Sequence, residues 1–163
     1  MALRFRNLAV DPSDPVTGWP TEAVRTALER GDLGDWHRLA VAIRVDPWGR
    51  TARQVEEVLG HDRPYGVAEA MEALIARVRV RAERSEREAV AAEIRRAIAR
   101  SGLTRAEFAS RVGTSTSRLS TYATGRVSPS ATLMVRIRRL LDRTVRDPGR
   151  PGPDRSTGDQ DRA

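Results

Sequence analysis

The stretch from Leu103 to Gly125 limits the possible folds of this chain more than any other part of the sequence. Thr104 and Glu107 have the spacing of a capping box, in which the two side chains satisfy the first backbone N–H groups of a helix. Gly113 comes directly after the apolar positions of this helix. A glycine there can adopt the left-handed conformation that ends a helix without steric cost. The pattern predicts two short helices joined by a tight turn.

The second short helix, over about residues 115–124, has an unusual outer face. Ser115 is its expected N-cap, and Leu119 and Tyr122 are expected to face inward. The remaining positions are short and polar or basic: Thr116, Ser117, Arg118, Ser120, Thr121 and Thr124. Such side chains suit a helix that lies against base edges and phosphates. An ordinary antiparallel helix pair with a polar outer face fits the periodicity equally well.

The positive charge of the chain is concentrated around this helix pair. All 29 basic residues are Arg, and the formal net charge is +7. Residues 81–146 hold 15 Arg and 6 acidic residues, whereas residues 1–80 hold 11 Arg and 12 acidic residues. A local excess of Arg, which binds phosphate with a bidentate fork, indicates a polyanionic partner for residues 81–146.

The sequence carries no pattern typical of catalysis, metal binding or membrane insertion. It has no Cys, and His37 and His61 lack the HExxH spacing of a zinc site. No Gly-rich phosphate loop is present, and Ser115, Ser117 and Ser120 lack the context of a nucleophile elbow. No apolar run could span a bilayer, and the N-terminus has no signal-peptide core. We therefore expect a soluble cytoplasmic protein with no enzyme activity, cofactor, metal or membrane partner.

Residues 1–80 are predicted to form a small helical domain. Gly31, Asp46-Pro47 and Gly60 separate three helical patterns, over about residues 21–30, 32–45 and 49–59. The expected core consists of Trp36, Leu39, Ile43, Val55 and Leu59. Because this segment is nearly neutral, it suits dimerisation or the binding of a protein partner better than DNA contact.

A long helical segment follows from Val67 to Ser101, without Gly or Pro. Its two ends have apolar stripes, whereas residues 81–88 are polar on all sides, which is typical of a helix that bridges two domains. Two alternatives stay open: a continuous helix through this linker, or a break near Ser85. A coiled-coil seam is disfavoured because no heptad pattern continues through the linker.

Residues 89–146 are predicted to form a four-helix domain. Its first helix ends near Arg100, the two short helices follow, and the fourth begins near Ser130. Residues 147–163 contain too few apolar side chains to fold and are predicted to be a disordered tail. The expected fold is therefore all-α, with a small N-terminal helical domain, a long helical linker and a four-helix domain.

Within residues 89–142, the run from Glu93 to Leu141 resembles the Cro/CI-type helix-turn-helix domains of phage repressors, the XRE-like or lambda-repressor-like class. The residues that carry the resemblance are Leu103-Thr104-Arg105-Ala106-Glu107, Ala109, Gly113, Ser115, Leu119, Tyr122, Gly125 and Ser128-Pro129. It covers about a third of the chain. Two departures are Thr114, where the family has an aliphatic residue, and a Pro-rich tail in place of a fifth, dimer-forming helix.

The resemblance implies that this domain binds double-stranded DNA with its second short helix. The positions that would read bases are Thr116, Ser117, Arg118 and Thr121. The positions that would contact phosphates are Arg105, Ser115, Thr124, Arg126 and Ser128.

These observations predict a sequence-specific DNA-binding transcriptional regulator, with repression as the expected mode. A homodimer would pair two reading helices, and residues 1–80 are the expected source of the dimer contact. Two alternatives stay open. One is the antitoxin of a toxin–antitoxin pair, in which residues 1–80 bind a toxin and the C-terminal domain autoregulates. The other is a protein–protein adaptor that has lost DNA binding.

Overall fold

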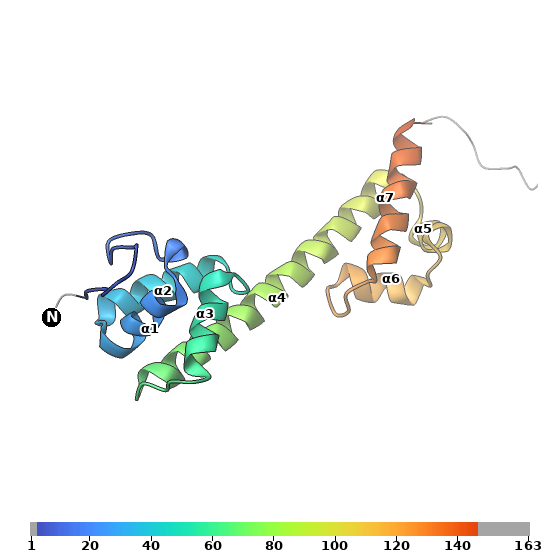
Figure 1. The fold of residues 1–163 in the computed structure, drawn as a ribbon. Coiled ribbons are helices and arrows are strands. Elements are labelled where there is room, and N and C mark those ends of the chain that lie inside the picture. The colour runs from blue at the N-terminus through green and yellow to red at the C-terminus, as the bar shows by residue number, and fades with distance from the viewer. Residues whose placement is uncertain (1–2, 147–163) are drawn as a thin grey trace, which may run out of the picture. The chain divides into compact units, whose positions relative to one another are not determined.

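The computed structural model describes the backbone of residues 3–146 and the side chains of residues 3–143. Throughout this part the secondary structure is helical, without strands, which confirms the predicted all-α class (Figure 1). None of its helices is long and apolar enough to cross a membrane. The predicted tail, residues 147–163, lies outside the described residues.

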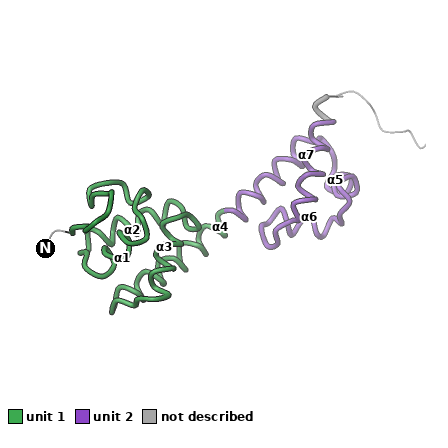
Figure 2. The backbone as a smooth tube through the Cα atoms, viewed as in Figure 1, with its two compact units in different colours: residues 1–85 green, residues 86–163 purple. Residues whose placement is uncertain are grey.

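One short 3-10 helix precedes seven α-helices in the described residues. The elements are η1 (Val16–Gly18), α1 (Thr21–Arg30), α2 (Leu33–Val45), α3 (Arg50–Leu59), α4 (Val67–Ser101), α5 (Arg105–Val112), α6 (Thr116–Ala123) and α7 (Ala131–Arg146). The chain divides into two compact units, residues 1–85 and 86–163, and the boundary falls within α4 (Figure 2).

The helices of the first unit begin and end where the sequence patterns predict. Asp32 is the N-cap of α2, and its carboxylate accepts hydrogen bonds from the N–H groups of Gly34 and Asp35, at 2.8 and 3.3 Å. The Asp35 carboxylate accepts a hydrogen bond in return from the Asp32 N–H, at 3.2 Å. This reciprocal pair satisfies backbone donors that the first turn of a helix leaves without partners.

The largest fully buried side chain in the core of the first unit is Trp19, which was not among the predicted core residues. Trp19 is fully buried, and the ring of Phe5 meets it edge-on at a centroid distance of 5.0 Å. The guanidinium of Arg38 lies 4.9 Å from the Trp19 ring centroid. Residues before α1 therefore pack against the helices and complete this core.

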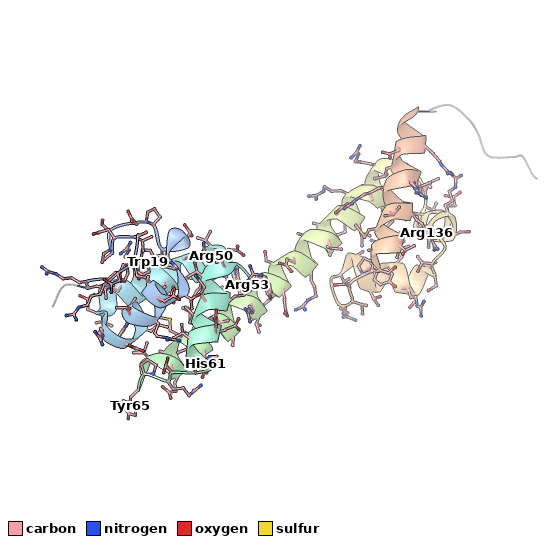
Figure 3. All side chains as sticks on the ribbon, viewed as in Figure 1. Trp19, Arg50, Arg53, His61, Tyr65 and Arg136 are labelled. Carbon is pink, nitrogen blue, oxygen red and sulfur yellow. The ribbon has the colours of Figure 1, made fainter. Side chains whose placement is uncertain are left out.

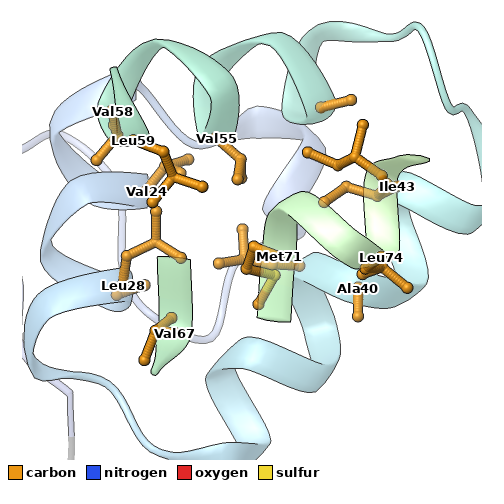
Figure 4. Packing of buried hydrophobic residues seen from close by; sticks show 14 of the residues in the cluster. Val24, Leu28, Ala40, Ile43, Val55, Val58, Leu59, Val67, Met71 and Leu74 are labelled. Atoms are coloured by element: carbon orange, nitrogen blue, oxygen red, sulfur yellow. The ribbon is translucent and has the colours of Figure 1, made fainter. Parts of the chain in front are cut away.

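The prediction that Trp36 is a core residue was wrong in part. Trp36 is only partly buried at the edge of the cluster, where its Nε1 donates a hydrogen bond to the Ala27 carbonyl at 2.9 Å. This bond keeps the polar edge of the indole near the surface, as is usual for an amphipathic aromatic side chain. The other four predicted core residues are buried: Leu39, Ile43, Val55 and Leu59. Figure 4 shows the last three of them in the core.

The helix α4 is continuous from Val67 to Ser101, so there is no break near Ser85. Its first turns contribute Met71 and Ile75 to the core of the first unit, and Ile94 belongs to the core of the second. Between them, residues 83–89 are all exposed. Arg, Glu and Ala are strong helix formers, which accounts for the helix in a segment that has no core to pack against.

Candidate nucleic-acid interface

A compact apolar core fixes the two short helices of the second unit. Phe108 on α5, Leu119 on α6 and Ile137 on α7 are each at most 1% exposed. Ile94 of α4 joins the same cluster and is fully buried. Burial of these side chains holds α5 against both α6 and α7, and so determines which face of α6 remains in solvent.

Local hydrogen bonds define the start of α5 as the sequence predicts. The Thr104 hydroxyl oxygen accepts a hydrogen bond from the Glu107 N–H at 3.3 Å. The Glu107 carboxylate accepts hydrogen bonds from the Thr104 hydroxyl and the Thr104 N–H, at 2.7 and 2.8 Å. These two bonds lower the pKa of the Glu107 carboxyl below its ordinary value.

The turn between α5 and α6 has the predicted left-handed glycine. Gly113 has φ 74° and ψ 43°, and the N–H of Thr114 donates a hydrogen bond to the Ala109 carbonyl at 2.9 Å. Thr114, the next residue, is partly buried. The chain therefore reverses direction within a few residues and begins α6 at Thr116.

Replacing Gly113 with Ala is expected to lower the free energy of unfolding by about 1–2 kcal/mol, because a side chain disfavours the left-handed region. Chemical denaturation of the full chain measures this loss. Gly102 is also left-handed, at φ 66°, but a Cβ added there would meet open space, whereas a Cβ at Gly113 would lie 3.2 Å from Arg136 Nη1. Gly102→Ala is thus the control for backbone strain alone. An unchanged stability of Gly113→Ala would contradict the left-handed turn.

The first turn of α6 presents three exposed polar side chains that have no hydrogen bond or ion pair among the described residues. Ser115 is the N-cap, and its hydroxyl oxygen accepts a hydrogen bond from the Arg118 N–H at 3.2 Å. The predicted base-reading residues Thr116, Ser117 and Arg118 are exposed, and their side chains make no hydrogen bond or ion pair with any described residue. Their polar groups are therefore available to a partner.

The later hydroxyls of α6 are partly committed to their own helix. Thr121 is partly exposed, and its hydroxyl donates a hydrogen bond to the Arg118 carbonyl at 2.8 Å. The Thr124 hydroxyl bonds the carbonyls of Ser120 and Thr121, at 3.0 and 3.1 Å. In this conformation each hydroxyl retains only its acceptor capacity for a partner.

A hollow of about 260 Å³ lies between α4, α5 and α6, and its apolar lining is Ile98, Leu119 and Ala123. Arg105, Thr116 and Ser117 line it as well, so two predicted base-reading residues and one predicted phosphate contact share a single surface feature. The other predicted phosphate contacts do not line the hollow: Ser115 and Thr124 cap the two ends of α6, and Arg126 and Ser128 lie exposed in the segment between α6 and α7.

Ser120 also lines the hollow, although it was not among the predicted contacts. It is exposed and follows Thr116 by four positions and Ser117 by three, which places all three on one helix face. That spacing was visible in the sequence and could have identified Ser120. The candidate interface therefore contains one more hydroxyl than the sequence analysis assigned.

The arginines of the second unit fall into two groups. Arg95 donates a hydrogen bond from Nη1 to the Ala123 carbonyl at 2.7 Å, and Arg138 forms an ion pair with Glu93 at 3.1 Å. These two have structural partners. The others are exposed and make no hydrogen bond or ion pair with described residues: Arg87, Arg96, Arg100, Arg105, Arg111, Arg118, Arg126, Arg136, Arg139 and Arg143. This surplus of unpaired Arg favours an anionic partner.

Comparison with known proteins agrees with this geometry for one part of the chain. Residues 94–147 match a protein family described as Helix-turn-helix. No curated protein and no solved structure matches the chain. The match points to a DNA-binding helix-turn-helix regulator and leaves residues 1–93 outside the family. Residues 94–147 are therefore a helix-turn-helix domain, with a helix order and a left-handed turn consistent with the Cro/CI type.

Proposed function

We propose that the second unit binds double-stranded DNA in a sequence-specific manner and that the protein is a transcriptional repressor. The observation that carries this proposal is the uncommitted first turn of α6, where Thr116 and Ser117 share a hollow with Arg105. An α-helix fits the major groove of B-DNA, where each base pair presents a distinct set of donors and acceptors. A domain bound at a promoter would exclude other proteins from that site.

The residues of the first turn of α6 have the chemistry for modest base readout. Ser and Thr hydroxyls can donate to or accept from base edges, and a Thr methyl group can contact a thymine methyl. Arg118 can form a bidentate contact with guanine O6 and N7, the strongest discriminating contact available to this face. Thr121 would act through its remaining acceptor capacity, and Ser120 would add a third hydroxyl in the hollow, beside those of Thr116 and Ser117.

The proposed phosphate contacts surround this reading face. Arg105 and Arg126 would bind phosphates through charge-assisted hydrogen bonds. Ser115 uses its oxygen to cap α6, so its hydroxyl hydrogen would be the group that reaches a phosphate. Thr124 and Ser128 would add hydroxyl contacts, which position the domain but carry no sequence information.

Selection of bound sequences from a pool of random DNA duplexes tests the proposal directly. We expect a short enriched motif, and a palindrome of two such motifs would indicate that two copies bind together. Recovery of unenriched, random sequences at all salt concentrations would contradict sequence-specific binding. A reporter placed behind the enriched site should then be repressed by the protein.

Two kinds of substitution should separate phosphate positioning from base readout. Arg105→Ala is expected to weaken binding to all duplexes alike, because a phosphate contact does not depend on sequence. Ser117→Ala or Thr121→Ala should instead change the preference between sites by about 1–3 kcal/mol. Titration of each variant against the selected site and a scrambled duplex measures both effects. Equal losses on both duplexes for all three variants would count against the assignment.

A further inference from the structure

The first unit contains a cavity that DNA binding does not use. Its volume is about 540 Å³, within the range of about 300–1,000 Å³ that is typical of small-molecule sites. It lies between η1, α2 and the first turn of α3.

One wall of the cavity is apolar and partly open to solvent. Val16 of η1 and Ala42 of α2 form its inner part. Val41 and Val45, one turn apart on α2, line it as well and remain 44% and 80% exposed. An apolar chain laid along this wall would remove these side chains from water, which is favourable in proportion to the area buried.

The other end of the cavity is polar and has unused donors. The N-cap of α3 is Gly49, which has no side chain to bond the first N–H groups of the helix. Thr51, in the first turn, lines the cavity and is only 5% exposed, yet its hydroxyl makes no hydrogen bond with any described residue. This hydroxyl is not fully enclosed, so it is accessible from the cavity and can bond to a ligand there.

The charges around this polar end favour an anion. Arg50 lines the cavity, is exposed, and has no ion pair among the described residues. A helix N-terminus adds a partial positive charge and free N–H groups. His37 also lines the cavity and is exposed.

Two other charged residues of the lining have defined positions. The Arg38 guanidinium donates hydrogen bonds to the carbonyls of Pro12 and Asp14 and stacks on Trp19. Only its aliphatic stem is therefore left to line the cavity. Asp46 is exposed, and its carboxylate lies against Gly49, where an added Cβ would be 2.1 Å from Asp46 Oδ2. This carboxylate opposes a bound anion, and its removal should strengthen binding.

We propose that this cavity binds a small molecule with an apolar chain and a terminal carboxylate. The chain lies along Val41 and Val45, and the carboxylate accepts hydrogen bonds from Arg50 and from the Thr51 hydroxyl at the start of α3. The site is independent of the helix-turn-helix domain, and it gives the first unit a ligand-binding role.

Calorimetric titration of the full-length protein with octanoate, 1-octanol and octylammonium tests the head group. We expect octanoate to bind at one site and about tenfold more tightly than octanol, because it gains charge-assisted hydrogen bonds. Octylammonium should bind more weakly than octanol. Each methylene added, from hexanoate to decanoate, should raise affinity about fourfold until the cavity is filled.

Matched variants test whether octanoate binds in this cavity. Arg50→Gln and Thr51→Val should each weaken octanoate binding and leave octanol binding unchanged. Arg53, one turn later on α3, is also exposed and has no ion pair among the described residues, but it does not line the cavity. Arg53→Gln should therefore change neither affinity (Figure 3). Val45→Glu should weaken both ligands, and Asp46→Asn should tighten octanoate binding.

Several results would overturn the proposal. These are the absence of saturable octanoate binding, equal affinities for the three head groups, or an equal loss of octanoate affinity in Arg53→Gln and Arg50→Gln. Far-ultraviolet circular dichroism of each variant separates a lost contact from a lost fold. DNA binding should be unchanged by Arg50→Gln, so failure of this proposal is distinguishable from failure of the proposed DNA-binding function.

Discussion

Replacing Trp19 with Ala is expected to lower the free energy of unfolding of the first unit by about 3–5 kcal/mol. The side chain is fully buried, so its removal leaves a cavity that the surrounding helices can fill only in part. Two further contacts would be lost, the edge-on packing of Phe5 and the stacking of Arg38 on the indole. Each of these is worth about 0.5–1.5 kcal/mol in other proteins.

Urea unfolding followed by far-ultraviolet circular dichroism measures this effect. All three Trp residues lie in the first unit, so the fluorescence of the remaining two reports specifically on it. Trp48, which is 42% exposed, provides the matched control, and Trp48→Ala should cost less than about 1 kcal/mol. Similar losses for Trp19→Ala and Trp48→Ala would show that Trp19 is not the centre of this core.

Raising the salt concentration from 50 to 200 mM should weaken DNA binding by about 10³-fold or more if about six to ten phosphates are neutralised. The physical reason is the release of counterions from DNA when Arg side chains replace them. The second unit supports such a dependence because most of its exposed arginines have no partner among the described residues. Affinities measured across a salt series give the slope directly.

Two arginines provide the comparison within that experiment. Arg105→Ala should reduce the slope of log affinity against log salt by about one. Arg138 is ion-paired with Glu93, so Arg138→Ala should leave the slope nearly unchanged. A flat salt dependence would contradict DNA binding through this surface and would favour the adaptor alternative.

The positions of the helices could be predicted because their ends are marked by local chemistry. Asp32 and Thr104 begin helices through capping boxes, and Gly113 ends one in the left-handed region. Each of these signals depends on residues only a few positions apart, so the sequence contains all the information needed. The helix-turn-helix domain could be recognised for the same reason, since its defining residues lie within one short stretch.

Burial was harder to predict than helix position. Trp36 lies in a helical pattern and was expected in the core, but the buried tryptophan is Trp19, in an extended segment before α1. Periodicity says nothing about a residue outside a helix, and Phe5 and Arg38 reach Trp19 only through tertiary folding. The cavity beside α2 has the same origin, since its lining comes from three separate elements.

Whether α4 is continuous could not be predicted from the sequence, for a different reason. The sequence left a break near Ser85 open because residues 81–88 have no apolar face whose burial would enforce a helix. The structure shows that good helix formers suffice there. The proposed contacts of α6 with DNA remain predictions, since they depend on a partner rather than on the fold.

The exposed middle of α4 should unfold locally more readily than the two ends of the helix. Residues 83–89 are all exposed, so melting one turn there breaks backbone hydrogen bonds but uncovers no apolar core. Melting a turn at either end would expose Met71 or Ile94 as well. Amide protons within this single unbroken helix therefore have unequal protection from solvent, lowest at its centre, which is the reverse of the fraying expected for an isolated helix.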